Sequence, residues 1–195
     1  MNKSAVLVFS IILTIMAMIP LVSCRDVEKS ETQINTDPSE VKIYAELDGI
    51  TVEEELHRFE IRDAFAGLDT ELSIKEWETF AGLYIQNEPE FRIVVLFTDD
   101  GEETIKPYIR DGMEEYVEVR TASVPYFKLQ NAQSEISSSI RSLGIPTASE
   151  IDIYTNRVKV FVVDLRSVDE AICEGKLIVP DYVDIIKVES LMGEE

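Results

Sequence analysis

The fold is decided by the stretch Arg92-Ile93-Val94-Val95-Leu96-Phe97-Thr98-Asp99. Phe91, Ile93, Val95 and Phe97 recur with a period of two, which is the pattern of a β-strand whose successive side chains point to opposite faces. The residues between them, Val94 and Leu96, are also apolar. We therefore expect a strand with both faces at least partly covered.

The same pattern returns further along the chain in Arg157-Val158-Lys159-Val160-Phe161-Val162-Val163-Asp164. A second pair of stretches follows the first pair at nearly equal spacing: Glu115-Tyr116-Val117-Glu118-Val119 and Asp181-Tyr182-Val183-Asp184-Ile185. Two matches in register predict an internal duplication, so the two halves of the domain should have the same order of elements.

That order is helix, strand, strand, helix, strand. Thr51-Val52-Glu53-Glu54 is a capping box that opens the first helix, and Gly67 together with a shift of the apolar phase predicts a bent helix or two short ones. In the second half a long helix begins at Ser123 and stops at Gly144. The predicted strands cover 80–86, 91–98, 116–121, 151–154, 157–163 and 183–188, and the other predicted helices cover 102–110 and 167–174.

These elements predict an α+β protein built from two similar small units, 46–122 and 123–195. Each unit should be an antiparallel sheet covered on one face by helices. The pattern leaves open whether the two units form separate lobes or one continuous sheet.

The beginning of the chain has the features of a secretory signal peptide, predicted over residues 1–23. Lys3 precedes the apolar stretch 5–18, Pro20 follows, and Leu21-Val22-Ser23-Cys24 comes next. A retained membrane-spanning anchor and an ordinary signal with an incidental cysteine are the alternatives. Leu21-Val22-Ser23-Cys24 resembles the bacterial lipobox. The resemblance implies cleavage between Ser23 and Cys24, lipidation of Cys24 with chains such as palmitate, and an extracytoplasmic protein anchored to the bacterial cell membrane or, where the host has one, the outer membrane.

The composition narrows the classes of partner. The chain carries 18 Lys+Arg against 38 Asp+Glu, a formal charge of −20, and such a surface repels nucleic acid.

Residues 24–45 begin with a polar segment and are predicted to be a flexible tether. With Cys24 acylated, Cys173 has no intramolecular partner, and we expect it to be buried and inert in the helix 167–174.

Few residues suggest chemistry. The single histidine, His57, is expected to face solvent, and it has no nucleophile nearby in the sequence. The acidic run Asp99-Asp100-Gly101-Glu102-Glu103 lacks the alternating oxygen ligands of a calcium loop. We therefore predict no metal, no cofactor and no enzyme activity. The candidate partner-binding residues are Arg157, Lys159 and Phe161. They share one face of a strand, and the valines that alternate with them lie on the opposite face.

Two stretches resemble a known family. They are similar to parts of the prosegments of α-lytic protease and the streptogrisins. The first is Phe80-Ala81-Gly82-Leu83-Tyr84-Ile85 together with the strand 92–99. The second is the helix 126–143 together with Thr155-Asn156-Arg157-Val158-Lys159-Val160. Those prosegments are two-lobed modules that catalyse the folding of the protease attached to them and then inhibit it. They bind by sheet augmentation and place a C-terminal tail in the active site of the protease. Since this sequence ends at Glu195 without a protease domain, the resemblance implies a chaperone or inhibitor acting in trans on an exported protein such as a serine protease. The alternative is a passive structural envelope lipoprotein that self-associates.

Overall fold

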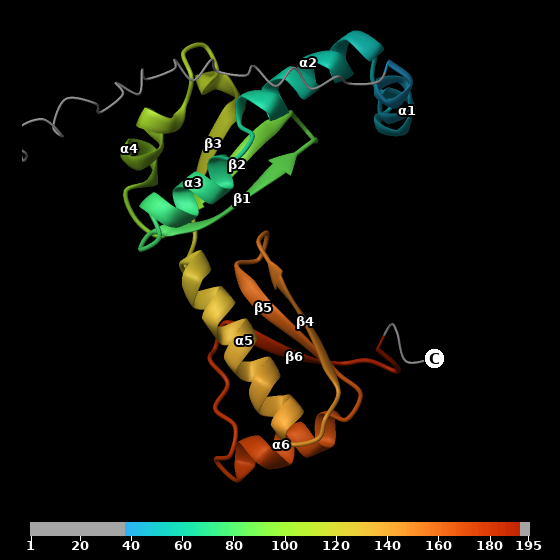
Figure 1. Cartoon of the computed structure of the whole chain (residues 1–195), viewed down its shortest axis with the longest axis vertical. Helices are drawn as coiled ribbons and strands as arrows, with labels where there is room; N and C mark the ends of the chain where they lie inside the picture. Colours follow the sequence, from blue (N-terminus) through green and yellow to red (C-terminus); the bar gives the residue numbers. More distant parts are fainter. Residues whose placement is uncertain (1–37, 192–195) are drawn as a thin grey trace, which may run out of the picture. The chain divides into compact units, whose positions relative to one another are not determined.

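The computed structural model describes residues 38–191 (Figure 1). The predicted signal peptide, the cleavage position at Ser23 and the lipidated Cys24 lie outside the described residues, as does the tether up to residue 37. The elements of the first half are α1 (Pro38–Asp48), α2 (Val52–Ala64), α3 (Leu68–Lys75), β1 (Phe80–Gln86), β2 (Arg92–Phe97), α4 (Gly101–Ile105), the short 3-10 turns Lys106–Tyr108 and Glu114–Tyr116, and β3 (Val117–Thr121). The elements of the second half are α5 (Tyr126–Ser142), β4 (Thr147–Asp152), β5 (Arg157–Val162), α6 (Leu165–Cys173) and β6 (Val183–Lys187).

The predicted α+β class and the repeated order of elements are confirmed. There are two separate three-stranded sheets, ordered β1-β2-β3 and β4-β5-β6. The prediction of antiparallel sheets holds only for the two hairpins, because β3 runs parallel to β2 and β6 runs parallel to β5. In each half a helical crossover separates the second strand from the third, and such a connection returns the chain to the end where the strand began.

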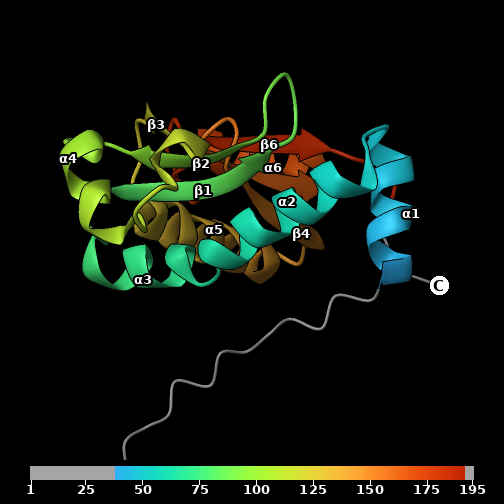
Figure 2. The same cartoon turned by 90° about the horizontal axis from the view of Figure 1, so that it is seen from above.

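Helices cover one face of each sheet (Figures 1 and 2). In the first sheet Ile93, Val95 and Phe97 pack against apolar side chains of α2 and α3. The opposite face, with Val94 and Leu96, packs against Ile153 of the second half. Both faces of β2 are therefore covered, as its continuous apolar sequence predicted.

The first helices begin and end where local sequence dictates. The Oγ1 of Thr51 accepts a hydrogen bond from the amide of Glu54 at 3.1 Å, so the threonine half of the predicted capping box is present. The Glu54 side chain does not complete the box. The Glu54 carboxylate bonds to Arg58 Nε at 3.0 Å. Gly67, at φ +80°, separates α2 from α3, as two short helices require.

The prediction of a tether over 24–45 is wrong for residues 38–45, which belong to α1. Val41 and Ala45 lie one helical turn apart and are both buried, and α1 contacts α2. An i, i+4 pair of apolar residues suffices to fix one face of a short helix when another helix lies beside it.

The two halves contact each other and belong to one compact unit. Ile153, in the turn between β4 and β5, packs against Val94 and Leu96 of the first sheet. Asn156 of the same turn ties it to the start of the second half: its Oδ1 accepts from the amides of Ser123 and Val124 at 3.0 and 2.7 Å, and its Nδ2 donates to the carbonyl of Val124 at 2.8 Å. The boundary predicted at 122/123 thus separates two sheets that pack together.

Candidate protein-binding face

Within residues 38–191, helices bury one face of the second sheet, and the side chains of its other face are half-buried or exposed. Val158, Val160 and Val162 of β5 are fully buried against α5 and α6. The alternate residues of the same strand, Arg157, Lys159 and Phe161, are half-buried and lie on the other face. The strand register places their neighbours in β4 and β6 beside them. We call this set the open face; its members are Ala148, Glu150, Asp152, Arg157, Lys159, Phe161, Asp184 and Ile186.

The charges of the open face are paired across the strands. The Nε and Nη2 atoms of Arg157 donate to the two carboxylate oxygens of Asp184 at 2.7 and 2.8 Å. The Nζ of Lys159 lies 2.7 Å from Asp152 Oδ2 and 3.9 Å from Glu150 Oε1. The sequence predicted a basic and aromatic face. In the structure three carboxylates surround its two cations, so each cation of the face belongs to an ion pair.

These contacts shift the pKa values of the carboxyls. The hydrogen bond from Arg157 holds the pKa of Asp184 below its ordinary value, against the opposing effect of burial. The hydrogen bond from Lys159 does the same to the pKa of Asp152, and it raises the pKa of Lys159. The lowered pKa values of the two aspartates and the raised pKa of Lys159 keep these ion pairs charged at neutral pH.

The end of the open face is apolar and its flanks are free. Phe161 has Ala148 beside it in β4 and Ile186 beside it in β6. Within residues 38–191 no further strand pairs with β4 or β6, so both are edge strands. An edge strand offers backbone amides and carbonyls to an incoming strand, and an adjacent aromatic ring offers it apolar area.

The other residues singled out by sequence are placed as follows. The Nε2 of His57 lies 2.9 Å from the Tyr116 hydroxyl and its Nδ1 lies 3.7 Å from Glu60, at the surface, as expected. The run Asp99–Glu103 forms the turn into α4, where Asp100 has φ +46°. In the part of the chain that the structure describes, no three His, Cys, Asp or Glu side chains are grouped to hold a metal ion.

The expectation that Cys173 is buried is wrong, because its side chain is exposed. Val168 and Ala171 form the buried side of α6, and Cys173 at the end of that helix lies away from it.

Sequence reasoning missed two residues. Asn156 was not singled out; it adopts the left-handed backbone (φ +53°) that asparagine tolerates better than most residues, so an asparagine between two predicted strands was the available signal. Glu55 follows two other glutamates in the first turn of α2, and it is completely buried. No local signal distinguishes Glu55 from its neighbours Glu53 and Glu54.

No protein-family model matches the chain, and no curated protein matches it either. None of the helices between residues 38 and 191 has the length and hydropathy needed to cross a bilayer.

Proposed function

We propose that this protein is an extracytoplasmic, lipid-anchored, non-enzymatic module that binds an exported protein through the open face of its second sheet. The observation that carries the proposal is that, among residues 38–191, helices pack against one face of the sheet β4-β5-β6 while the side chains of the other face stay half-buried or exposed. The similarity to protease prosegments makes an exported serine protease the first partner to test, with chaperoning or inhibition in trans as the activity.

The form of the face supports protein binding. Its cations and carboxylates are already held by one another, so little side-chain freedom is lost when a partner docks. The partner would meet a charge-paired surface with an apolar end at Phe161 and two strand edges, β4 and β6, that no other strand within residues 38–191 pairs with. This combination suits sheet augmentation, in which main-chain bonds provide affinity and side-chain contacts provide selectivity.

The test is affinity capture with residues 25–195 as bait, from host envelope and secreted fractions, read by mass spectrometry. The blocking variant is Ala148→Arg, since Ala148 is exposed on the open face. The matched control is Ser139→Arg, an equal charge change at an exposed position of α5, on the covered side of the sheet. We expect near-stoichiometric capture by the parent and by Ser139→Arg, and at least about tenfold weaker binding by Ala148→Arg.

Capture that Ala148→Arg leaves unchanged would contradict the assignment of the open face. Recovery of the bait alone would favour the second candidate, a structural lipoprotein that self-associates. One observation favours that candidate: Ile43 and Leu47 of α1 expose 56% and 75% of their surface.

The anchor has its own test. Replacing Cys24 by serine should abolish acyl labelling in the host and release the protein from the membrane fraction. Labelling that persists in the variant would refute lipidation at Cys24.

A further inference from the structure

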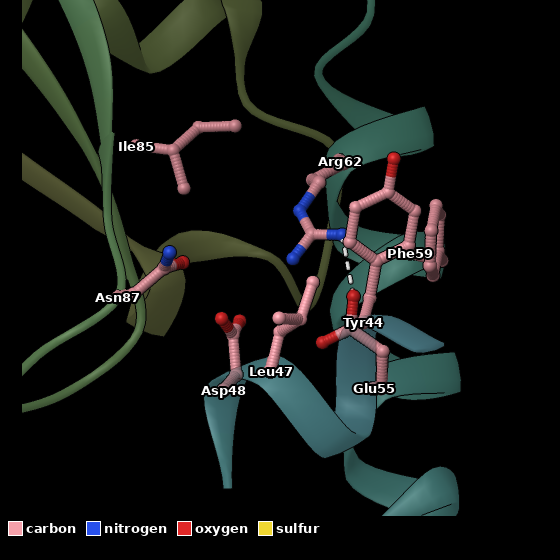
Figure 3. Close-up of a pocket in the computed structure, with 8 residues that line it drawn as sticks. All are labelled: Tyr44, Leu47, Asp48, Glu55, Phe59, Arg62, Ile85 and Asn87. Atoms are coloured by element: carbon pink, nitrogen blue, oxygen red, sulfur yellow. Dashed lines mark hydrogen bonds and ion pairs between the residues drawn. The ribbon is translucent and has the colours of Figure 1, made fainter. Parts of the chain in front are cut away.

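A cavity of about 540 Å³ lies beside α1, α2 and the end of β1 (Figure 3). It falls within the range of small-molecule sites, which is roughly 300–1,000 Å³. Its apolar lining comes from Leu47, Phe59 and Ile85, and its charged lining comes from Asp48, Glu55 and Arg62. The cavity lies in the first half of the protein and shares no residue with the open face.

Glu55 is the unusual member of this lining, because its side chain is only 1% exposed. Its Oε1 accepts a hydrogen bond from Arg62 Nη1 at 2.9 Å. Its Oε2 is buried, and no group among the described residues donates to it. Figure 3 shows this second oxygen turned away from Arg62, on the side of Leu47.

A buried carboxylate oxygen without a donor is costly, and hydrogen bonds to charged groups are stronger than neutral ones. The position of Oε2 therefore calls for a donor group, and Glu55 is one of the residues that line the cavity, so a ligand bound there lies beside this carboxylate.

The charge of the cavity selects the kind of donor. Two carboxylates, Glu55 and Asp48, line it against one guanidinium. The Arg62 guanidinium stacks on Phe59, 4.8 Å from the ring centroid, and reaches Glu55 through a single nitrogen. The nearest cation to Asp48 is Arg58, at 4.0 Å. The surplus of one negative charge favours a monocation over a neutral or anionic ligand.

We propose that this cavity binds a small organic amine, whose primary ammonium group donates to Oε2 of Glu55 while its hydrocarbon body lies between Leu47 and Ile85. The ammonium supplies three donors and no acceptor, so it satisfies Glu55 and leaves a second bond for Asp48. This site is independent of the protein-binding function proposed above.

The test is isothermal titration of the full-length chain, in a non-ionic detergent, with phenethylamine as the probe. The control ligand is 2-phenylethanol, which has the same body and no charge. We expect saturable binding of the amine, with a dissociation constant between about 0.1 and 10 mM for so small a ligand, and at least about tenfold weaker binding of the alcohol.

Two pairs of variants locate the site. Glu55→Gln should weaken amine binding at least about tenfold, whereas Glu53→Gln, at an exposed position of the same helix, should leave it unchanged. The second pair does not depend on a buried residue. Leu47→Lys places a competing ammonium at the cavity, whereas Ile43→Lys makes the same charge change on α1 outside the lining. We expect the first of these to abolish binding and the second to preserve it.

Equal affinity for the amine and the alcohol would overturn the proposal, as would amine binding that survives Leu47→Lys. Absence of any binding at about 10 mM phenethylamine would also overturn it. None of these outcomes bears on capture of a protein by the open face.

Discussion

Replacing Gly82 by alanine tests the contact between the two sheets. Gly82 lies in β1, where the register with β2 shifts, and its φ is +137°. A Cβ built on it would lie 2.8 Å from Cγ2 and 2.9 Å from Cδ1 of Ile153, which belongs to the turn after β4. The substitution therefore introduces backbone strain and a steric overlap at the same position.

Each effect has a known order of magnitude. An L-residue held in a sparsely populated backbone region costs about 1–3 kcal/mol. An extra methyl group forced into a packed contact costs about 1–3 kcal/mol. We therefore expect Gly82→Ala to lower the free energy of unfolding by about 2–6 kcal/mol, measured by urea denaturation with circular dichroism.

Two other glycines separate the effects. Gly67 has φ +80° with open space where a Cβ would go, so Gly67→Ala should show the backbone cost alone, about 1–2 kcal/mol. At Gly101 a Cβ would lie 2.7 Å from Cγ1 of Val119, and no unusual φ is involved, so Gly101→Ala should show the steric cost alone.

The double variant Gly82→Ala with Ile153→Ala completes the cycle. Because truncating Ile153 removes the overlapping atoms, the double variant should be more stable than the sum of the single effects predicts, by about 1–3 kcal/mol. Additive effects, to within about 0.5 kcal/mol, would refute the steric reasoning. Gly82→Ala no more destabilising than Gly67→Ala would refute it as well.

Three further predictions concern side-chain contacts. Asn156→Ala should lower the free energy of unfolding by about 2–4 kcal/mol, because three hydrogen bonds to the start of the second half are lost; chemical denaturation checks this, and a cost under about 0.5 kcal/mol would contradict it. The hydrogen bond to Glu76 raises the pKa of Tyr108 from 10.0 to about 12. The raised pKa favours the protonated phenol in the folded state. The contribution of Tyr108 to the stability of the fold is therefore complete below pH 10.0 and is lost as the pH rises towards about 12. Subtracting the ultraviolet titration of Tyr108→Phe from that of the parent should show one tyrosine ionising near that pH, and ionisation near 10.0 would refute the contact. Arg157 lowers the pKa of Asp184, so this group stabilises the fold above its unfolded pKa and the contribution is lost as the pH falls through the lower folded value. Asp184→Asn should therefore flatten the acid side of the stability profile, and an unchanged acid limb would contradict the pairing.

Local sequence predicted most of the elements because its signals act between near neighbours. The Thr51 cap, the stop at Gly144 and the period-two strands each depend on residues within a few positions of one another. The two matched stretches around 92–99 and 157–164 likewise predicted that both halves have the same order of elements, which the structure confirms. On the open face, alternation alone placed Arg157, Lys159 and Phe161 opposite the buried valines.

The candidate site was predicted only in part. The side on which Arg157 and Lys159 lie follows from the strand period, but their partners Asp184 and Asp152 come from neighbouring strands. The strand register sets those pairs, and it depends on how the whole sheet assembles. The face that the sequence predicted to be basic and aromatic therefore has its two cations paired with carboxylates.

By itself the sequence determined the order of strands and helices from α2 onward, its repetition in the two halves and the buried face of β5, because periodicity and capping are properties of adjacent residues. Only the tertiary structure decided the parallel third strands, the exposure of Cys173 and the burial of Glu55. These features depend on which segments meet after the chain has folded. Glu55 illustrates the difference: it is one of three consecutive glutamates in the sequence, and packing of α1 beside α2 leaves it alone among them fully buried.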